Sequence, residues 1–314
     1  MRQSDPALEW PTLLFLAVAY GAWMLGTMTL WTVSPVLAVI LTGLTVAQFS
    51  SLQHEVLHGH PFRNPHLNHA LIFLPVGLLY PFGRFRDTHL EHHFDPNLTD
   101  PYDDPESNFQ DPDVWTRLPG WRRALLRANN TLLGRLVLGT AIGGVSFIRA
   151  DFIAMAKGNR IIQRDWALHA VGLVLLGLWL GLVGTMPIWA YLLAAYIGNS
   201  LIKIRTFLEH RAHDAHRARS VVVEDRGPLS WLFLNNNYHV VHHCHPNVPW
   251  YDLPGLYRTN RDHFLRRNEG YVYRSYAQIF AKYLWRAKDP VPHPIWPVKK
   301  GQPNTPDCDL KAAE

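Results

Sequence analysis

The sequence predicts an all-α membrane protein in which four transmembrane helices form two hairpins and a cytoplasmic helical cap holds a His-rich metal site. Three observations predict this class: long apolar runs alternate with stretches dense in His, Arg and Asp, two pairs of these runs are joined by very short turns, and histidine motifs follow the runs. The 314 residues, of which 48% are hydrophobic, are enough for one or two folded domains and exclude a disordered chain.

Four apolar runs are long enough to cross a bilayer, which takes ~20 residues of helix. They cover residues 11–31, 33–51, 166–184 and 187–204. The turns "WTVSP" and "GTMP" within the two pairs carry no charge, whereas Lys and Arg gather near the opposite ends. The positive-inside rule therefore places both termini and the metal site in the cytoplasm, most simply at a bacterial inner membrane. Buried helices of a soluble α protein are the alternative, but four such runs with uncharged turns are hard to cover with soluble protein.

Two further apolar stretches are not expected to span. Residues 70–83 are short and broken by two prolines, which suits an interfacial or re-entrant segment. Residues 131–155 are interrupted by Arg135, Arg149 and Asp151, as expected of helices that lie along the membrane surface.

The remaining sequence is expected to form one domain with a tail. We expect a single domain over residues 1–288 and a loosely ordered, Pro-rich tail over residues 289–314. No removable signal peptide is expected in the first ten residues. Cys244 and Cys308 show neither CxxC spacing nor a disulfide framework, so any metal chemistry rests on imidazole.

Three histidine motifs, "HEVLH", "HLEHH" and "HVVHH", lie on the expected cytoplasmic face. Positions i, i+3 and i+4 share one helix face, so each motif can direct several ring nitrogens to one place. One such motif among 18 histidines is a weak signal, but three on one face are a strong one. The candidate ligands from these motifs are His54, His58, His89, His92, His93, His239, His242 and His243.

The first motif also matches the zinc-hydrolase pattern His54-Glu55-x-x-His58. A membrane zinc protease needs a third ligand, commonly an Asp before Gly, and the chain contains no Asp-Gly pair. A metal transporter is the other alternative, but it needs polar ligands inside the spans, where only His169 and Asn199 stand out. The zinc-hydrolase alternative would also leave the other two histidine motifs without a role.

The ordered motifs around two helix hairpins resemble the integral-membrane fatty acid desaturase and hydroxylase superfamily, from the first span to about Leu256. The resemblance implies a di-metal site of two non-haem iron ions held by eight or nine histidines, with O2 as co-substrate and an unactivated C–H bond of a long alkyl or acyl chain as the target. It assigns the eight motif histidines as ligands and His210 of "RTFLEH" as the ninth. "HEVLHGHP" and "LTDPYDDPES" are also similar to the bacterial hydrocarbon-oxygenase component named from rhizopine catabolism.

Two outcomes are compatible with such a ligand set. The motif pattern is typical of the desaturase branch, which favours desaturation of a lipid-linked acyl chain. Hydroxylation of an acyl chain, an alkane or another hydrocarbon by the same site is the alternative. Geometry at the iron decides between them, because two adjacent C–H bonds must face the oxidant for an alkene to form.

Electrons must come from another protein, because the sequence has no Gly-rich nucleotide fingerprint, no cysteine set for an iron–sulfur cluster and no haem motif. A separate ferredoxin or rubredoxin with its reductase is implied, and no nucleic-acid partner is expected. Opposite charge steers such encounters, so we expect an acidic carrier to dock on a basic surface of the cap. That surface comprises Arg258, Arg261, Arg266, Arg267, Arg274 and Lys282. Contact of these residues with anionic lipid is an equal alternative.

Several polar residues near the ligands are candidates for a supporting role, because carboxylates commonly orient metal-bound imidazoles. They are Glu55, Glu91, Glu209, Asp95, Asp100, Asp103 and Asp104, with a solvated charge as the alternative for each. Asn235 is expected either to hold an iron-bound water or to cap a helix. His60 and His245 each precede a proline and are left out of the ligand set.

Overall fold

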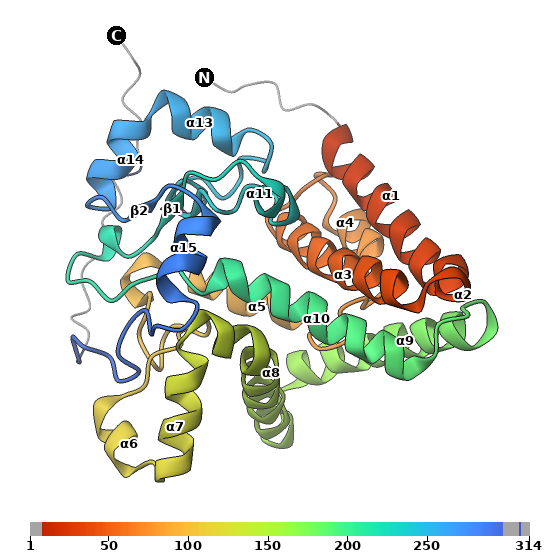
Figure 1. Cartoon of the computed structure of the whole chain (residues 1–314), viewed down its shortest axis with the longest axis horizontal. Helices are drawn as coiled ribbons and strands as arrows, with labels where there is room; N and C mark the ends of the chain where they lie inside the picture. Colours follow the sequence, from red (N-terminus) through yellow and green to blue (C-terminus); the bar gives the residue numbers. More distant parts are fainter. Residues whose placement is uncertain (1–7, 298–307, 309–314) are drawn as a thin grey trace. The chain divides into compact units, whose positions relative to one another are not determined.

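The computed structural model describes residues 8–297 and 308, which are mainly helical (Figure 1). The chain divides into two compact units. Unit 1 comprises Met1–Arg86 and Thr140–Ile202, and unit 2 comprises Asp87–Gly139 and Lys203–Glu314. The expected single domain over residues 1–288 stays a prediction.

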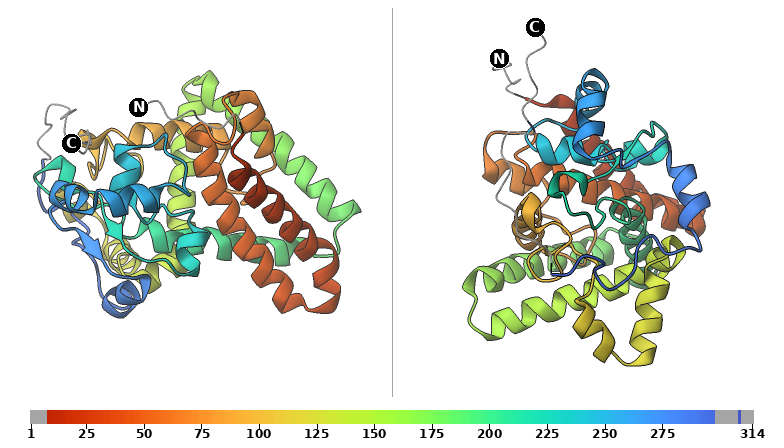
Figure 2. Two further views of the ribbon diagram at one scale, coloured as in Figure 1. Left: turned by 90° about the horizontal axis from the view of Figure 1, so that it is seen from above. Right: turned by 90° about the vertical axis from the view of Figure 1, so that its left-hand side faces the viewer.

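Unit 1 begins with a helical hairpin. Helix α1 (Trp10–Leu25), a π-helix (Gly26–Leu30) and α2 (Trp31–Val33) follow one another without a break, and α3 (Pro35–Leu57) returns beside them (Figures 1 and 2). Ser34 ends the first arm and caps the second, because its side chain accepts a hydrogen bond from the backbone of α3. Both arms are long and apolar enough to cross a membrane, in agreement with the first two expected spans.

The second hairpin of unit 1 joins α9 (Arg160–Leu182) to α10 (Ile188–Thr206) through a short turn. This turn meets the turn of the first hairpin, since the backbone nitrogens of Thr185 and Met186 donate to the Thr27 carbonyl oxygen at 2.8 and 3.1 Å. Thr27 lies in the π-helix, where the altered helical pairing leaves its carbonyl available to another segment. The turn of the second hairpin therefore lies beside the end of the first arm, in agreement with the expectation that both turns are on the same side.

The set of candidate spans differs from the prediction at two helices, α10 and α8 (Leu132–Ala156). Helix α9 is a candidate, as expected, whereas α10, the expected span over residues 187–204, is not among the candidates found in the described part of the chain. The physical reason is composition, because α10 is a helix but carries Lys203 and Arg205 in its last turn.

Helix α8 (Leu132–Ala156) is the fourth candidate span, although we expected it to lie along the membrane surface. Two of the three charges that led to that prediction, Arg135 and Asp151, are buried within the protein, and Arg149 is exposed. Asp151 is 2% exposed and accepts a hydrogen bond from Arg84 Nε at 3.0 Å. Arg135 is 5% exposed and donates from Nε to the Asn129 carbonyl oxygen at 3.0 Å. A paired charge inside the protein does not prevent a helix from being a span.

Residues 72–81 lie between α4 (Pro65–Leu71) and α5 (Phe82–His92) and form no helix, as their prolines predicted. Their backbone is satisfied by side chains instead. Carbonyl oxygens of residues 76–78 pair at 2.8–2.9 Å with Tyr191 Oη, Asn199 Nδ2 and His169 Nε2. The two polar residues noted inside the expected spans thus have a structural role in supporting irregular backbone.

Helices α3 and α10 approach closely at a glycine. A Cβ atom added at Gly198 would lie 2.5 Å from the Gly43 carbonyl oxygen and 2.5 Å from Val46 Cβ. Small residues at such crossings let helix backbones pack together. This contact fixes α10 against the helix that carries the first histidine motif.

Unit 2 consists of short helices and one pair of strands. The helices are α6 (Pro112–Arg117), α7 (Gly120–Asn129), α11 (Pro228–Leu232), α12 (His239–Cys244), α13 (Leu253–Thr259), α14 (Arg261–Arg267) and α15 (Tyr276–Tyr283), with 3-10 turns at Asp95–Asn97 and His216–Ala218. Strands β1 (Val222–Val223) and β2 (Val272–Tyr273) pair in parallel. Val240 and Val241 of α12 pack in a buried cluster with Tyr238, Tyr257 and Phe264, which anchors the third histidine motif.

The expected tail is described only in part. Val291 and His293 are buried, and their backbones pair with Gln110 at 2.9 and 2.8 Å. Residues 298–307 and 309–314 lie outside the described residues, so a loosely ordered tail there stays a prediction.

Candidate metal centre

The histidine motifs lie where helices end or where a helix is very short. His89 and His92 occupy the last turn of α5, and His93 follows directly. His239, His242 and His243 lie in α12, while His210 lies in the segment after α10 and pairs with Ser220 in an isolated bridge. Unit 2 brings these seven imidazoles together in two adjacent groups.

The first group in unit 2 contains His89, His93 and His242, whose ligand atoms lie within 4.8 Å of one another. His93 Nε2 is 2.9 Å from His89 Nε2 and 3.1 Å from His242 Nε2. The same nitrogen of each ring therefore points to one place. Two neutral rings can share at most one proton between a facing pair of nitrogens, so three nitrogens that face one another cannot all be paired by hydrogen bonds. A cation bound by all three would satisfy them.

The second group contains His92, His210, His239 and His243. His210 Nε2 is 2.9 Å from His92 Nε2 and 3.0 Å from His239 Nε2. His239 Nε2 is 3.1 Å from His243 Nε2. The two groups are neighbours, since the rings of His93 and His243 stack with centroids 4.3 Å apart.

The spacing of these nitrogens fits metal ligands. Imidazole nitrogens bind a divalent first-row metal at about 2.1 Å, so ligands at right angles are about 3.0 Å apart and tetrahedral ligands about 3.4 Å apart. The Nε2 separations of 2.9–3.1 Å agree with ligands at right angles. Imidazole donors suit iron among the divalent first-row metals.

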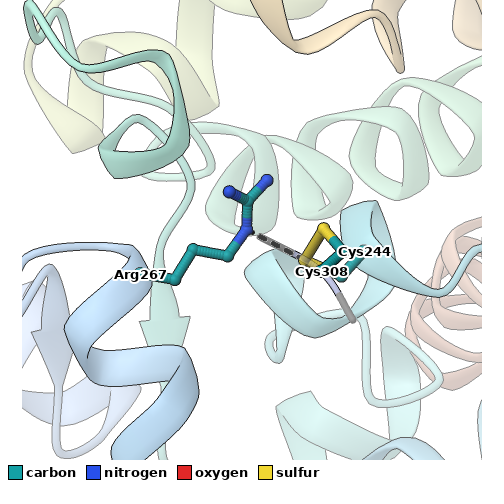
Figure 3. The surroundings of a disulfide bond; sticks show 3 residues. All are labelled: Cys244, Arg267 and Cys308. Carbon is teal, nitrogen blue, oxygen red and sulfur yellow. Dashed lines mark hydrogen bonds between the residues drawn. A yellow bond between two sulfur atoms is a disulfide. The ribbon is translucent and has the colours of Figure 1, made fainter. Parts of the chain in front are cut away.

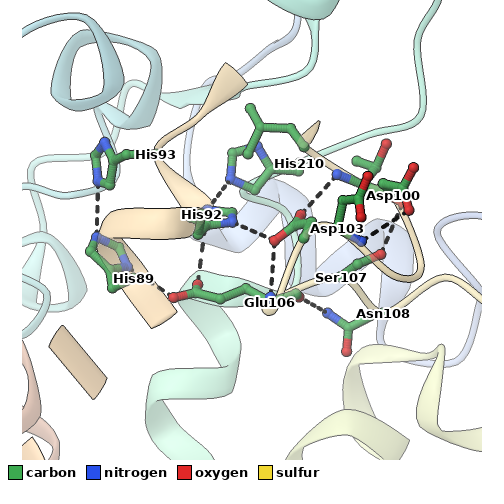
Figure 4. Close-up of polar contacts among 12 residues, drawn as sticks. His89, His92, His93, Asp100, Asp103, Glu106, Ser107, Asn108 and His210 are labelled. Carbon is green, nitrogen blue, oxygen red and sulfur yellow. Dashed lines mark hydrogen bonds and ion pairs between the residues drawn. The ribbon is translucent and has the colours of Figure 1, made fainter. Parts of the chain in front are cut away.

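Carboxylates hold the opposite nitrogens of two rings (Figure 4). Asp104 Oδ1 is 2.8 Å from His92 Nδ1, and Glu106 Oε1 is 2.9 Å from His89 Nδ1. An Nδ1–H group that donates to a carboxylate leaves Nε2 as the metal-facing nitrogen. Of the expected acidic candidates after α5, Asp104 has this role. Glu106 was not singled out in the sequence, although it lies in the same acidic loop.

The ring of His239 also has polar partners at Nδ1. His239 Nδ1 is 3.1 Å from Asn236 Oδ1 and 3.6 Å from Glu209 Oε1, and Glu209 pairs with Arg205 at 2.7 Å. The prediction for Glu209 thus agrees with the geometry. Asn235 was expected at an iron-bound water or a helix cap, but its Nδ2 donates to the Trp250 carbonyl oxygen at 3.1 Å.

Two of the other acidic candidates, Asp100 and Glu91, have different surroundings. Asp100 Oδ1 accepts from the backbone of Tyr102 at 2.8 Å and of Asp103 at 3.1 Å, so its carboxylate shapes the loop. Glu91 is exposed, which agrees with a solvated charge.

The protonation of these groups suits metal binding. Burial lowers the pKa of His89, His210 and His239, which keeps these imidazoles in the neutral, ligating form. Burial acts in the same direction on His92, but the carboxylates of Glu106 and Asp104 outweigh it and raise the pKa of His92 to about 9. His92 must therefore lose a proton when a metal binds.

The first motif belongs to unit 1. His54 lies in the last turn of α3 and His58 is its C-cap, with ring centroids 5.0 Å apart. Glu55 Oε1 is 3.8 Å from His54 Nδ1, and both side chains are buried. The two imidazoles thus lie near each other at one end of α3, as the i, i+4 spacing predicted. His60 instead has Nδ1 2.6 Å from Glu9 Oε1, which supports its exclusion from the ligand set.

The model of the fatty acid desaturase family matches residues 29–276. The chain belongs to this family. The resemblance to membrane desaturases and hydroxylases is therefore confirmed, and the protein is an oxidoreductase. Membership decides against the zinc-hydrolase and transporter interpretations. The subgroup named from rhizopine catabolism stays a prediction.

Curated relatives differ in the reaction that their names state. The chain is 26% identical over 262 residues to the sphingolipid delta(4)-desaturase/C4-monooxygenase of Homo sapiens. The aligned region covers 81% of this chain and 74% of the relative. It is 27% identical over 259 residues to the beta-carotene ketolase of Paracoccus sp. strain PC1, with 75% and 87% covered. The beta-carotene ketolase of Paracoccus sp. strain N81106 is 28% identical over 247 residues, with 73% and 82% covered.

Cys244, which directly follows the ligand motif of α12, forms a disulfide with Cys308 (Figure 3). The sequence did not predict this pairing, because 64 residues separate the two cysteines. Arg267 Nε donates to Cys244 Sγ at 2.9 Å, and Arg267 is 7% exposed. Arg267 was expected on the docking surface, and that prediction is wrong because its side chain is buried against the disulfide.

Proposed function

We propose that the protein is a membrane di-iron enzyme that uses O2 to desaturate a long acyl chain of a lipid. The observation that carries the proposal is the pair of neighbouring imidazole groups in unit 2, whose Nε2 atoms converge at 2.9–3.1 Å. The ligand set that we propose comprises these seven histidines together with His54 and His58. Family membership supports iron as the metal.

Iron bound by these imidazoles supplies the oxidising power for attack on an unactivated C–H bond. The chain's own residues bind and orient the ligand rings. Asp104 and Glu106 fix two rings through Nδ1, and the buried cluster around Val240 and Val241 holds α12 in place. Desaturation removes two hydrogen atoms from the acyl chain and, with O2, two electrons and two protons, yields a double bond and two waters.

The electron donor is proposed to be a separate ferredoxin or rubredoxin with its reductase. The sequence contains no nucleotide-binding fingerprint and no cysteine set for an iron–sulfur cluster, which supports an external source. We place the protein in a bacterial inner membrane with both termini and the metal site on the cytoplasmic side. The uncharged turns and the basic residues at the opposite ends of the spans support this orientation.

Hydroxylation of an acyl chain or another hydrocarbon is the second candidate. The names of the relatives favour it, since one is a desaturase and C4-monooxygenase and two are ketolases. Both reactions begin with removal of one hydrogen atom, and the position of the chain decides whether a second hydrogen or an oxygen atom is transferred.

Isotope labelling separates the two reactions. Purified protein is supplied with deuterated acyl lipid, 18-oxygen dioxygen and a reductant, and the lipid is analysed by mass spectrometry. The proposal predicts an alkene that has lost two deuterium atoms and carries no label. Labelled oxygen on the chain would establish hydroxylation, and an unchanged lipid with the iron-loaded protein would contradict the proposed substrate. His242→Ala is the matched control and is expected to give no product.

A further inference from the structure

Unit 2 contains a cleft of about 550 Å³ beside the end of the β1 and β2 pair. Its lining includes four arginines, Arg226, Arg258, Arg261 and Arg274, which are all exposed. Three of them belong to the basic surface expected from the sequence. Arg226 lies beside them because the segments that follow β1 and β2 both line the cleft.

The cleft retains a positive charge although two carboxylates also line it. Glu224 Oε1 accepts from Arg261 Nε and from Tyr257 Oη, both at 2.7 Å. Asp225 points to backbone donors, since its Oδ1 is 2.6 Å from Gly227 N and its Oδ2 is 2.9 Å from Tyr276 N. Four guanidinium groups therefore face two carboxylates that already have donors, and the cleft attracts an acidic partner.

One wall of the cleft leads directly to the metal ligands. Tyr238 lines the cleft, packs with its ring centroid 5.1 Å from that of Tyr257, and immediately precedes His239. The Tyr238 carbonyl oxygen also accepts from the backbone nitrogen of His242 at 3.1 Å. Tyr238 is 2% exposed, so a partner in the cleft would lie over the residue that precedes α12, the helix that contributes histidines to both imidazole groups of unit 2.

We propose that this arginine-lined cleft is the docking site of the acidic iron–sulfur protein that supplies the electrons. The inference rests on the proposed oxidase function. Each docked carrier is oxidised by one electron, so two successive encounters provide the two electrons of one turnover. The cleft suits this partner because it combines charge complementarity with a covalent connection from Tyr238 to the ligand His239.

The test measures binding of an acidic plant-type [2Fe–2S] ferredoxin to the full-length, iron-loaded protein in detergent. Arg258→Glu with Arg274→Glu is expected to raise the Kd at least about tenfold and to weaken its dependence on salt. Arg258→Lys with Arg274→Lys keeps the charge and is expected to stay within about threefold of the wild type. The matched control, Arg122→Glu with Arg127→Glu, reverses two exposed arginines of α7 and is expected to bind normally.

The iron content and thermal unfolding of each variant show whether it folds. If the glutamate variant fails to fold, the test is made with the Kd of the lysine variant and with the salt dependence of the wild-type Kd. An unchanged Kd in the glutamate variant would overturn the proposal. So would a variant that keeps its affinity for ferredoxin but loses affinity for vesicles of anionic lipid, since the cleft would then be a lipid contact. Failure of the proposed function is seen in a separate assay in which dithionite replaces the ferredoxin as reductant. If the proposed function is wrong, the wild-type protein gives no oxidised lipid in that assay.

Discussion

Replacement of Asp104 by Asn tests whether the acidic loop after α5 controls metal binding. The Asp104 carboxylate is 5% exposed and accepts from Thr99 N at 2.8 Å, from Glu106 N at 2.9 Å and from His92 Nδ1 at 2.8 Å. An Asn amide has one acceptor oxygen, so its NH2 group must face at least one of these donors. Asp104→Asn therefore leaves a buried donor unsatisfied and replaces the charged acceptor of the His92 ring by a neutral, weaker one.

The expected magnitude follows from the hydrogen bonds that are lost. A hydrogen bond to a charged group contributes about 1.5–3 kcal/mol, and loss of a group that orients a metal ligand weakens metal binding by about 10–100-fold. In the described contacts, His92 is the one ring of the second group that Asp104 contacts. We therefore expect the affinity of one iron site to fall and the affinity of the other to stay unchanged. Iron titration against a competing chelator measures this difference.

The control is Asp113→Asn, which makes the same chemical change at an exposed position of α6. It is expected to bind both iron ions as the wild type does. If Asp104→Asn also bound both ions with wild-type affinity, the role assigned to the Asp104 carboxylate would be refuted.

Three further predictions concern the ligand set and the fold. His210→Ala is expected to lower iron content and remove activity, because His210 Nε2 lies 2.9 and 3.0 Å from the Nε2 atoms of two other histidines. The control His66→Ala, at an exposed position, is expected to do neither. Metal analysis and product analysis check both variants. Arg219→Met is expected to destabilise the protein by about 3 kcal/mol, because the buried guanidinium donates to carbonyl oxygens before the acidic loop, and a wild-type Tm would contradict this. Gly198→Ala is expected to cost about 1–3 kcal/mol by overpacking at the helix crossing, while Gly177→Ala, where a Cβ meets nothing within 4 Å, should leave thermal unfolding unchanged.

The motif spacing in the sequence was sufficient to predict which imidazoles of unit 2 the structure brings together. Helical positions i, i+3 and i+4 depend only on local structure, so the convergence of His89 with His93 and of His239 with His243 could be predicted without a fold. His210 was different, because it lies outside a repeated motif and was assigned through family resemblance alone. The structure places its Nε2 in the second group.

Contacts between distant segments could not be predicted in this way. Glu106 and Asn236 orient ligands from loops, whose conformation depends on the whole of unit 2 rather than on a periodic pattern. The expected surface helix over residues 131–155 failed for a related reason. The sequence shows the charge of Asp151 but not the partner, Arg84, that allows it to be buried in an apolar helix.

Metal content is the most direct test of the central claim that paired imidazole groups make this chain a di-iron oxidase. Protein purified from iron-supplemented cells is analysed for iron and zinc by mass spectrometry against the protein concentration. The account predicts two iron ions per chain, with little zinc. One zinc ion per chain, and no gain of iron on reconstitution, would contradict it.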